Sequence, residues 1–399
     1  MKVEIYGLNH QGMGIGRINN KIIFVEHALI GEIVEVKIIK EYKKYMVGEV
    51  VKIIKSSSYR CNNHCKYYLE CGGCNIGILS YNKQLEFKKS KVIDIFKKYG
   101  NIKVNPDIVG SSSNGYRNKI TLHVYEGKLG YYKKNSNDIV KIDKCVICDD
   151  KINYIISIIE KKLDLNNVTK IVIRASSIES MVVFYGEVDI SKVIMYLSFV
   201  TSVYINDKLV IGKDKIIFKL DNYKFSVSKD SFFQVNSKQA EKLYKQVLEY
   251  ANLNKDDKVL DLYCGTGTIG IYLANHCKEV LGIELNPSCV EDARGNAISN
   301  NIENINFVCD SSSIINKLDI DVDVVVVDPP RSGLDSVTID TLNNSKINRI
   351  IYVSCNPMTL IRDINLLSDN YELKDIKLFD MFAFDYHIEI LMVLERKIL

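Results

Sequence analysis

The feature that most restricts how this chain can fold is a succession of strand, glycine turn and helix over residues 258–270. An apolar segment there is followed by Cys-Gly-Thr-Gly, and glycines in such a turn let the backbone approach a ligand closely at a helix N-terminus. From residue 231 onward apolar strands alternate with helices, which indicates a parallel sheet with crossover helices. Residues 231–399 are therefore predicted to form an α/β domain with a ligand site at one edge of its sheet.

Two further strand ends of this region carry carboxylates. Glu284 ends a strand about 20 residues after the glycine turn, where an acid can accept hydrogen bonds from both hydroxyls of a ribose. Asp310 ends the next strand and is placed to accept from the amine of an adenine. This pattern resembles the S-adenosylmethionine (SAM) site of class I, Rossmann-like methyltransferases. A nicotinamide enzyme is the competing interpretation, but no later segment resembles a hydride-transfer site.

The loop after the fourth strand reads Asp328-Pro329-Pro330-Arg331. Methyltransferases that act on exocyclic amines often place an aromatic residue after this tripeptide, where it stacks on the base. Arg331 stands there instead, so amine chemistry loses its stacking partner. Enzymes that methylate carbon 5 of cytosine usually place a thiol beside this proline, and none is present.

A single thiol, Cys355, follows the apolar strand at residues 349–353. A lone cysteine is most often a core residue, but one in a polar turn at a strand end suits a nucleophile over a ligand cleft. A thiolate that adds to carbon 6 of a pyrimidine enables carbon 5 to attack a methyl sulfonium. A base must then remove the proton from carbon 5. Glu389 is the candidate, with His387 expected on the same strand face; an exposed acid at a strand end is the alternative.

At this point the chain resembles a family, the RNA uracil carbon-5 methyltransferases that make 5-methyluridine in ribosomal or transfer RNA. The resemblance covers nearly the whole chain and implies that Cys355 is the nucleophile, Glu389 the base and SAM the methyl donor. The segments that carry it are Phe232-Phe233-Gln234-Val235-Asn236, Asp261-Leu262-Tyr263-Cys264-Gly265, Asp328-Pro329-Pro330-Arg331-x-Gly333, Ser354-Cys355-Asn356-Pro357 and His387-x-Glu389. The donor contacts that it implies are Gln234, Tyr263, Thr268, Glu284, Asp310 and Asp328.

The chain holds 11 cysteines but no apolar N-terminal core typical of a secretory signal, and its apolar runs are too short to span a membrane. A cytoplasmic protein without membrane contact is therefore expected, in which clustered cysteines indicate a metal centre rather than disulfides. The resembling family holds a [4Fe-4S] cluster on cysteines with the spacing of Cys65, Cys71, Cys74 and a distant fourth, here Cys145. Structural zinc is the alternative, with Cys71 and Cys74 joined by Cys145 and Cys148.

The first 230 residues are predicted to contact RNA. Residues 1–56 alternate short strands with glycines, as in a five-stranded, OB-like barrel that binds oligonucleotides or serves only in assembly; by resemblance this is a TRAM domain. Residues 57–230 read as a β-rich central domain that carries the iron-sulfur cluster, with a helix at 81–99 that packs on the methyltransferase domain. Basic stretches interleaved with tyrosines fit RNA phosphates and stacked bases. The expected substrate is a single-stranded or loop uridine, because the face of carbon 6 must be open. We expect 23S rRNA as the substrate RNA, with tRNA as the alternative. A monomer is the default expectation for the oligomeric state.

One departure from the family concerns the loop before Glu389. The family usually reads Asp-x-Phe-Pro-x-Thr-x-His-x-Glu, whereas here Ala383 and Asp385 replace the proline and the threonine. We therefore expect a less rigid loop. A catalytically degenerate iron-sulfur RNA-binding protein is the alternative that this departure supports. A small-molecule methyltransferase would leave the first 230 residues without a purpose.

Overall fold

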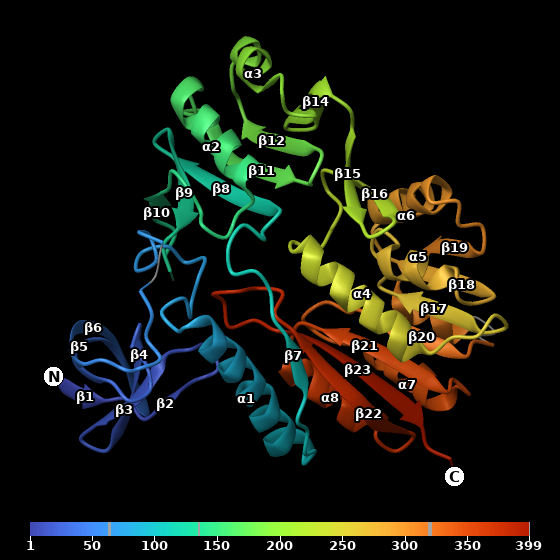
Figure 1. Ribbon diagram of the computed structural model, residues 1–399, viewed down its shortest axis with the longest axis horizontal. Helices are drawn as coiled ribbons and strands as arrows, with labels where there is room; N and C mark the ends of the chain where they lie inside the picture. Colours follow the sequence, from blue (N-terminus) through green and yellow to red (C-terminus); the bar gives the residue numbers. More distant parts are fainter. Residues whose placement is uncertain (63–64, 135, 318–320, 399) are drawn as a thin grey trace.

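The computed structural model describes residues 1–62, 65–134, 136–317 and 321–398. The barrel, the central sheet and the C-terminal sheet form three lobes, with α1 (Tyr81–Gly100) running beside the C-terminal sheet (Figure 1). No helix among the described residues is long and apolar enough to cross a bilayer.

The N-terminal lobe is a closed barrel. Its strands are β1 (Lys2–Glu4), β2 (Gly7–Leu8), β3 (Gly14–Ile18), β4 (Lys21–Glu26), β5 (Ile33–Glu41) and β6 (Tyr45–Lys55). They pair in the order β1-β5-β6-β4-β3-β2. β1 and β2 are two pieces of one bent segment, whose Tyr6 backbone N–H donates to the carbonyl of Ile15 (2.9 Å), so the two ends of the sheet meet. The predicted five-stranded barrel is thus present, with its first strand bent into two.

The central lobe is a seven-stranded sheet with α2 (Asp150–Lys162) and α3 (Ile190–Leu197) packed against it. Its strands, in pairing order, are β10 (Ile139–Lys141), β9 (Lys128–Tyr132), β8 (Lys119–Tyr125), β11 (Val168–Ala175), β12 (Ser180–Gly186), β13 (Ser202–Ile205) and β14 (Lys208–Gly212). Ile152, Ile156 and Ile159 lie on one face of α2 and are fully buried against the sheet. Burial of this apolar face stabilises the lobe.

The C-terminal lobe is the predicted α/β sheet, which is parallel except for one antiparallel strand, β23. In pairing order its strands are β19 (Ile305–Cys309), β18 (Glu279–Glu284), β17 (Lys258–Leu262), β20 (Val324–Val327), β21 (Arg349–Ser354), β23 (Glu389–Arg396), β22 (Tyr371–Phe379) and β7 (Asp107–Val109). One face is covered by α4 (Ser237–Ala251), α5 (Thr268–Ala274) and α6 (Pro287–Ser299). The other is covered by α1, the 3-10 turn η1 (Ser312–Lys317), α7 (Ser336–Asn344) and α8 (Pro357–Leu367).

Segments that precede residue 231 complete this sheet. β7 pairs in parallel with β22, and α1 buries Val92 and Phe96 in the same core as α7 and α8. A hairpin of β15 (Lys215–Leu220) and β16 (Tyr223–Ser228) lies against α6, where the N–H of Ser228 donates to Asp292 (2.9 Å). The methyltransferase core therefore recruits elements from the middle of the chain.

Candidate active site

Cys355 and Glu389 lie opposite one another at the ends of adjacent antiparallel strands. The last paired residues of β21 and β23 are Ser354 and Ile390, so the next position sets Cys355 against Glu389. Glu389 is buried, with 4% of its surface exposed. Cys355 is half-buried and lines a groove of about 480 Å³ between α1, the barrel loop and the C-terminal sheet. The candidate base is therefore shielded from water while the candidate nucleophile can be reached.

Burial, and then the neighbouring carboxylates, favour the protonated forms of Cys355 and Glu389 in the free protein. Burial raises the pKa of Asp328 to about 7. Burial, and then Asp328, raise the pKa of Glu389 well above its ordinary value. The pKa of the Cys355 thiol is raised to about 11 by burial, by Glu389 and by Asp328, with Arg331 opposing. A positive charge brought to this site would favour the thiolate.

Two hydrogen bonds hold the turn at Cys355 against the Asp-Pro-Pro-Arg loop. Asn356 caps α8 by accepting from the N–H of Met358 (3.1 Å), and its Nδ2 donates to the carbonyl of Arg331 (3.0 Å). The hydroxyl of Thr359 donates to the same carbonyl (3.2 Å). The expectation for His387 was wrong: it lies in the loop before β23, because the strand begins only at Glu389, and its Nε2 is 3.2 Å from Nη2 of Arg331.

The predicted donor residues gather at the carboxyl ends of the parallel strands. One cavity is lined by Gln234, Tyr263, Thr268 and Asp328. Glu284 reaches the glycine turn beside it, where its Oε2 accepts from the N–H of Gly265 (3.1 Å). Asp310 lies next to Glu284, and its N–H donates to the Glu284 carbonyl (3.1 Å). Glu284 and Asp310 do not line the cavity itself.

Two of these side chains have internal partners. Tyr263 has a φ of +61°, an uncommon backbone conformation outside glycine. Its hydroxyl accepts from Ser312 (2.8 Å) and lies 3.4 Å from the carboxylate of Asp335, the N-cap of α7. Thr268 donates its hydroxyl to Tyr244 on α4 (3.2 Å), a residue that also lines this cavity, so this hydroxyl already has a partner.

Sequence reasoning assigned no role to Asp261 or Tyr244. Asp261 is fully buried and accepts from the N–H of Gly270 (2.9 Å), which ties β17 to the first turn of α5. Burial, together with Asp328 and Glu284, raises the pKa of Asp261 to about 8. The sequence contained a signal for Asp261, because it is a lone acid inside the apolar run Val-Leu-Asp-Leu. Tyr244 had no such signal, because an aromatic residue at a core position of a helix is ordinary.

The four predicted cluster cysteines surround one space. The groove that they share has a volume of about 800 Å³ and also contains Phe232 and His387 from the methyltransferase side; the thiols are those of Cys65, Cys71, Cys74 and Cys145. Burial raises the pKa of Cys74 well above its ordinary value, and Cys145 and Cys71 raise it further. Within the described ranges no three His, Cys, Asp or Glu side chains are arranged to hold a single ion.

The fold and the site define a SAM-dependent methyltransferase of class I joined to an RNA-binding barrel. Residues 195–397 match the family model for tRNA (uracil-5-)-methyltransferase, and residues 1–51 match the TRAM domain. An uncharacterized RNA methyltransferase of Clostridium tetani is 37% identical over 98% of this chain and 95% of its own length. One from Staphylococcus aureus MSSA476 is 35% identical over 98% and 97%.

A solved structure extends the similarity over the whole chain. The crystal structure of Pyrococcus abyssi tRNA (uracil-54, C5)-methyltransferase in complex with S-adenosyl-L-homocysteine is 29% identical, has a TM-score of 0.81, and is matched over 99% of this chain and 100% of that one. This chain belongs to the tRNA (uracil-5-)-methyltransferase family. It is an RNA (uracil-5-)-methyltransferase that uses SAM.

Proposed function

We propose that the enzyme methylates uridine through a covalent adduct between Cys355 and carbon 6 of the base. The observation that carries this proposal is the opposition of Cys355 and Glu389 across β21 and β23. The thiol loses its proton to solvent, its sulfur bonds to carbon 6, and the electrons of the carbon 5–carbon 6 double bond pass to an enolate. Carbon 5 then attacks the methyl group of SAM, and the sulfonium becomes the neutral thioether of S-adenosylhomocysteine.

Glu389 completes the reaction as the base. Its carboxylate takes the proton from carbon 5, the double bond forms again, and the sulfur of Cys355 leaves as a thiolate. The charge of the donor suits this order of events. The sulfonium favours the thiolate of Cys355 and the carboxylate of Glu389 while it is present, so both groups lose their protons to solvent when SAM binds. Loss of the sulfonium charge on methyl transfer lets burial and Asp328 raise the basicity of Glu389 when the proton must be removed.

We assign donor binding to six residues at the carboxyl edge of the sheet. Glu284 accepts from the ribose hydroxyls and Asp310 from the adenine amine, because these acids end two adjacent strands. Thr268 contributes its methyl surface, since its hydroxyl is bonded to Tyr244. The remaining contacts are those of Gln234, Tyr263 and Asp328.

We propose that Cys65, Cys71, Cys74 and Cys145 hold a [4Fe-4S] cluster. Such a cluster would supply a rigid fourfold cross-link between the cysteine loop and the segment after β10, and methylation needs no electron transfer. Cys148 lies beside this set, with its sulfur 3.8 Å from the hydroxyl of Tyr131.

For the substrate we propose 23S rRNA, with tRNA as the alternative. The four-cysteine layout favours ribosomal RNA, whereas the solved relative from Pyrococcus abyssi acts on tRNA. Mapping 5-methyluridine in ribosomal and transfer RNA from a deletion strain distinguishes the two. Loss from a 23S rRNA position supports the proposal, and loss from tRNA alone replaces it.

The mechanism is tested with two variants and denaturing gels. Cys355→Ala should yield no 5-methyluridine in RNA from the deletion strain. Glu389→Gln should transfer the methyl group and remain attached to RNA after denaturation. Methylation by Cys355→Ala would refute covalent catalysis. Donor binding by the wild type without turnover on any RNA would favour the degenerate alternative.

A further inference from the structure

The loop between β22 and β23, residues 380–388, connects the methyltransferase sheet to its candidate base. Phe379 and Glu389 form the pair that closes this hairpin, so the loop begins at Asp380 and ends directly before Glu389. Its backbone bends at Phe384, which has a φ of +67°. The position of Glu389 therefore depends on what holds this loop.

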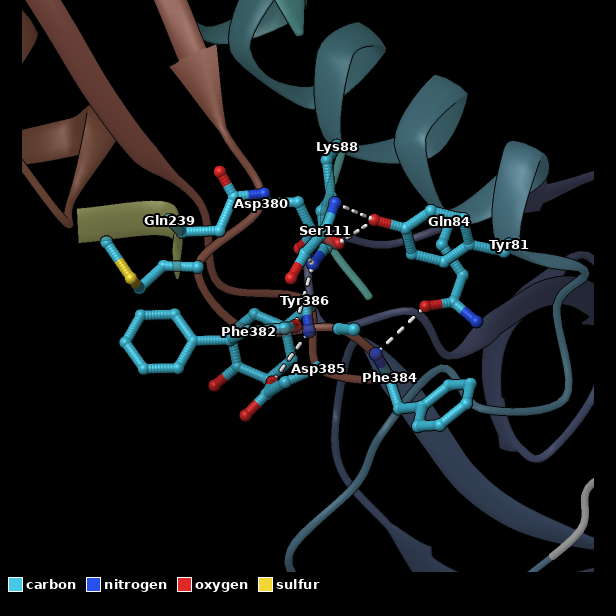
Figure 2. A network of polar contacts seen from close by, with 12 residues as sticks. Tyr81, Gln84, Lys88, Ser111, Gln239, Asp380, Phe382, Phe384, Asp385 and Tyr386 are labelled. Atoms are coloured by element: carbon cyan, nitrogen blue, oxygen red, sulfur yellow. Dashed lines mark hydrogen bonds and ion pairs between the residues drawn. The ribbon is translucent and has the colours of Figure 1, made fainter. Parts of the chain in front are cut away.

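Helix α1 makes the central contacts with the loop (Figure 2). The ammonium group of Lys88 lies 2.5 Å from Oδ1 of Asp380 and donates to the carbonyl of Phe382 (2.9 Å). One turn earlier, Oε1 of Gln84 accepts from the N–H of Phe384 (2.9 Å). Lys88, Gln84 and Asp380 are all fully buried. One face of the helix thus holds both the start and the bend of the loop.

Further groups from outside the C-terminal lobe also bond to this loop. The backbone N–H groups of Asn75 and Ile76, directly after Cys74, both donate to the carbonyl of Phe384 (2.9 Å each). The hydroxyl of Tyr116 donates to the carbonyl of Ala383 (3.0 Å). The side chain of Asp385 accepts from Asn75 (3.2 Å). These bonds hold the segment in which Ala383 and Asp385 replace the family's proline and threonine.

Burying the charges of Lys88 and Asp380 costs desolvation free energy, which suggests that this ion pair has a role beyond stability. Both side chains have no exposed surface, and two buried charges seldom stabilise a fold more than apolar residues of similar size would. The carboxylate of Asp380 has a second partner, the hydroxyl of Tyr81 (2.8 Å), which itself accepts from the N–H of Ser111 (2.5 Å). A buried network in which the polar groups have hydrogen-bond partners fixes the relative positions of its residues more strictly than apolar packing does.

We propose that Lys88 is a positioning residue for the second half of the reaction: it fixes the loop at residues 380–388 so that Glu389 reaches the proton on carbon 5. The proposal rests on the role of Glu389 given above. Lys88 touches neither Cys355 nor the donor cavity, which is lined by other residues. Its loss should therefore slow release of the adduct more than methyl transfer.

The test follows a single turnover of enzyme with methyl-labelled SAM and total RNA from the deletion strain. Total label in RNA measures methyl transfer, and label in RNA still bound to denatured protein measures unreleased adduct. For Lys88→Met we expect nearly normal transfer and release slowed roughly ten- to a hundredfold, as expected for a misplaced catalytic group. Lys89→Met is the matched control, because no hydrogen bond joins Lys89 to the loop among the described residues.

Two further variants separate positioning from folding. Lys88→Met leaves Asp380 buried without its cation, so the double variant Lys88→Met/Asp380→Asn removes that charge as well and should accumulate adduct too. Gln84→Leu loses one loop bond and should show a smaller delay. Transfer and release that fall together, or adduct levels equal to the Lys89→Met control, would overturn the proposal. If Glu389→Gln itself traps no adduct, the mechanism fails; if only the Lys88 variants trap none, the positioning role alone fails.

Discussion

The side-chain amide of Asn356 donates a 3.0 Å hydrogen bond to the backbone carbonyl of Arg331, which joins the turn at Cys355 to the loop that begins at Asp328. The same side chain accepts from the N–H of Met358 and caps α8. Asn356 thus caps helix α8, which follows the nucleophile, and also holds the turn at Cys355 close to the loop that contains Asp328 and Arg331.

These two roles of Asn356 can be separated by substitution. Asn356→Asp keeps the capping acceptor but replaces the amide donor with an oxygen that repels the Arg331 carbonyl. Asn356→Ala loses both and should cost about 1 kcal/mol of stability through the lost cap. We expect Asn356→Asp to melt close to the wild type yet to transfer methyl groups slowly. Thermal melts and single-turnover assays measure the two effects; wild-type rates in Asn356→Asp would show that the contact with Arg331 is dispensable.

The reactivity of Cys355 should depend on pH and on Arg331. With a pKa of about 11, the thiol is protonated at pH 8, and its alkylation rate should rise about tenfold per pH unit below that value. Arg331 lowers this pKa, so Arg331→Gln should slow alkylation at pH 8. SAM should accelerate it more than S-adenosylhomocysteine, because only SAM carries the sulfonium charge. Peptide mass spectrometry after iodoacetamide treatment follows Cys355 among the other thiols, and equal rates with both nucleosides would contradict the electrostatic account.

The candidate base should destabilise the fold as pH rises. Because burial raises the pKa of Glu389, the folded state keeps a proton that the unfolded state loses above its ordinary pKa near 4.5. The resulting loss of folding stability is absent below the ordinary pKa of a glutamate. It grows with pH until the folded-state pKa is passed, by at most about 1.4 kcal/mol per pH unit. Glu389→Gln should therefore match the wild type at pH 4.5 and be the more stable protein at pH 8. Urea unfolding at both pH values measures this; a constant difference would mean that Glu389 is ionised in the fold.

How well the sequence predicts each part of the structure depends on how far apart along the chain the contacting residues lie. The barrel, the alternation of strands and helices in the methyltransferase domain and the place of Cys355 at a strand end follow from local periodicity and from motifs at strand ends. The pairing of β7 with β22 joins residues 270 positions apart, and the contact of Lys88 with Asp380 joins residues 292 positions apart. Lys88 reads like any other lysine of a basic helix, such as Lys89. Its spacing of four and eight residues from the buried Val92 and Phe96 places it on the same stripe of the helix, but only the folded structure shows that Asp380 is its partner.

For the role of Thr268 in SAM binding, the structure leads to a different prediction than the sequence alone. Thr268 was expected to contact SAM, but its hydroxyl is bonded to Tyr244, so Thr268→Val should change SAM affinity by less than about threefold, equivalent to roughly 0.6 kcal/mol. Glu284→Gln should weaken binding much more, because a neutral amide accepts poorly from ribose hydroxyls. Calorimetric titration with SAM compares the two variants. A larger loss in Thr268→Val than in Glu284→Gln would mean that the hydroxyl turns to the donor on binding.

The cysteine loop provides the last prediction, because its chemistry and its contact with the base loop can be measured separately. Protein purified without oxygen should contain about four irons and absorb visible light, as a thiolate-bound four-iron cluster requires; zinc without iron would refute the cluster. Cys74→Ser should lose the iron. It should also loosen Asn75 and Ile76, which donate to the carbonyl of Phe384. Hydrogen exchange at these two amides should then rise in Cys74→Ser but not in Cys61→Ser, whose thiol bonds instead to the carbonyl of Gly77. Unchanged exchange after iron loss would show that the loop holds its position without the cluster.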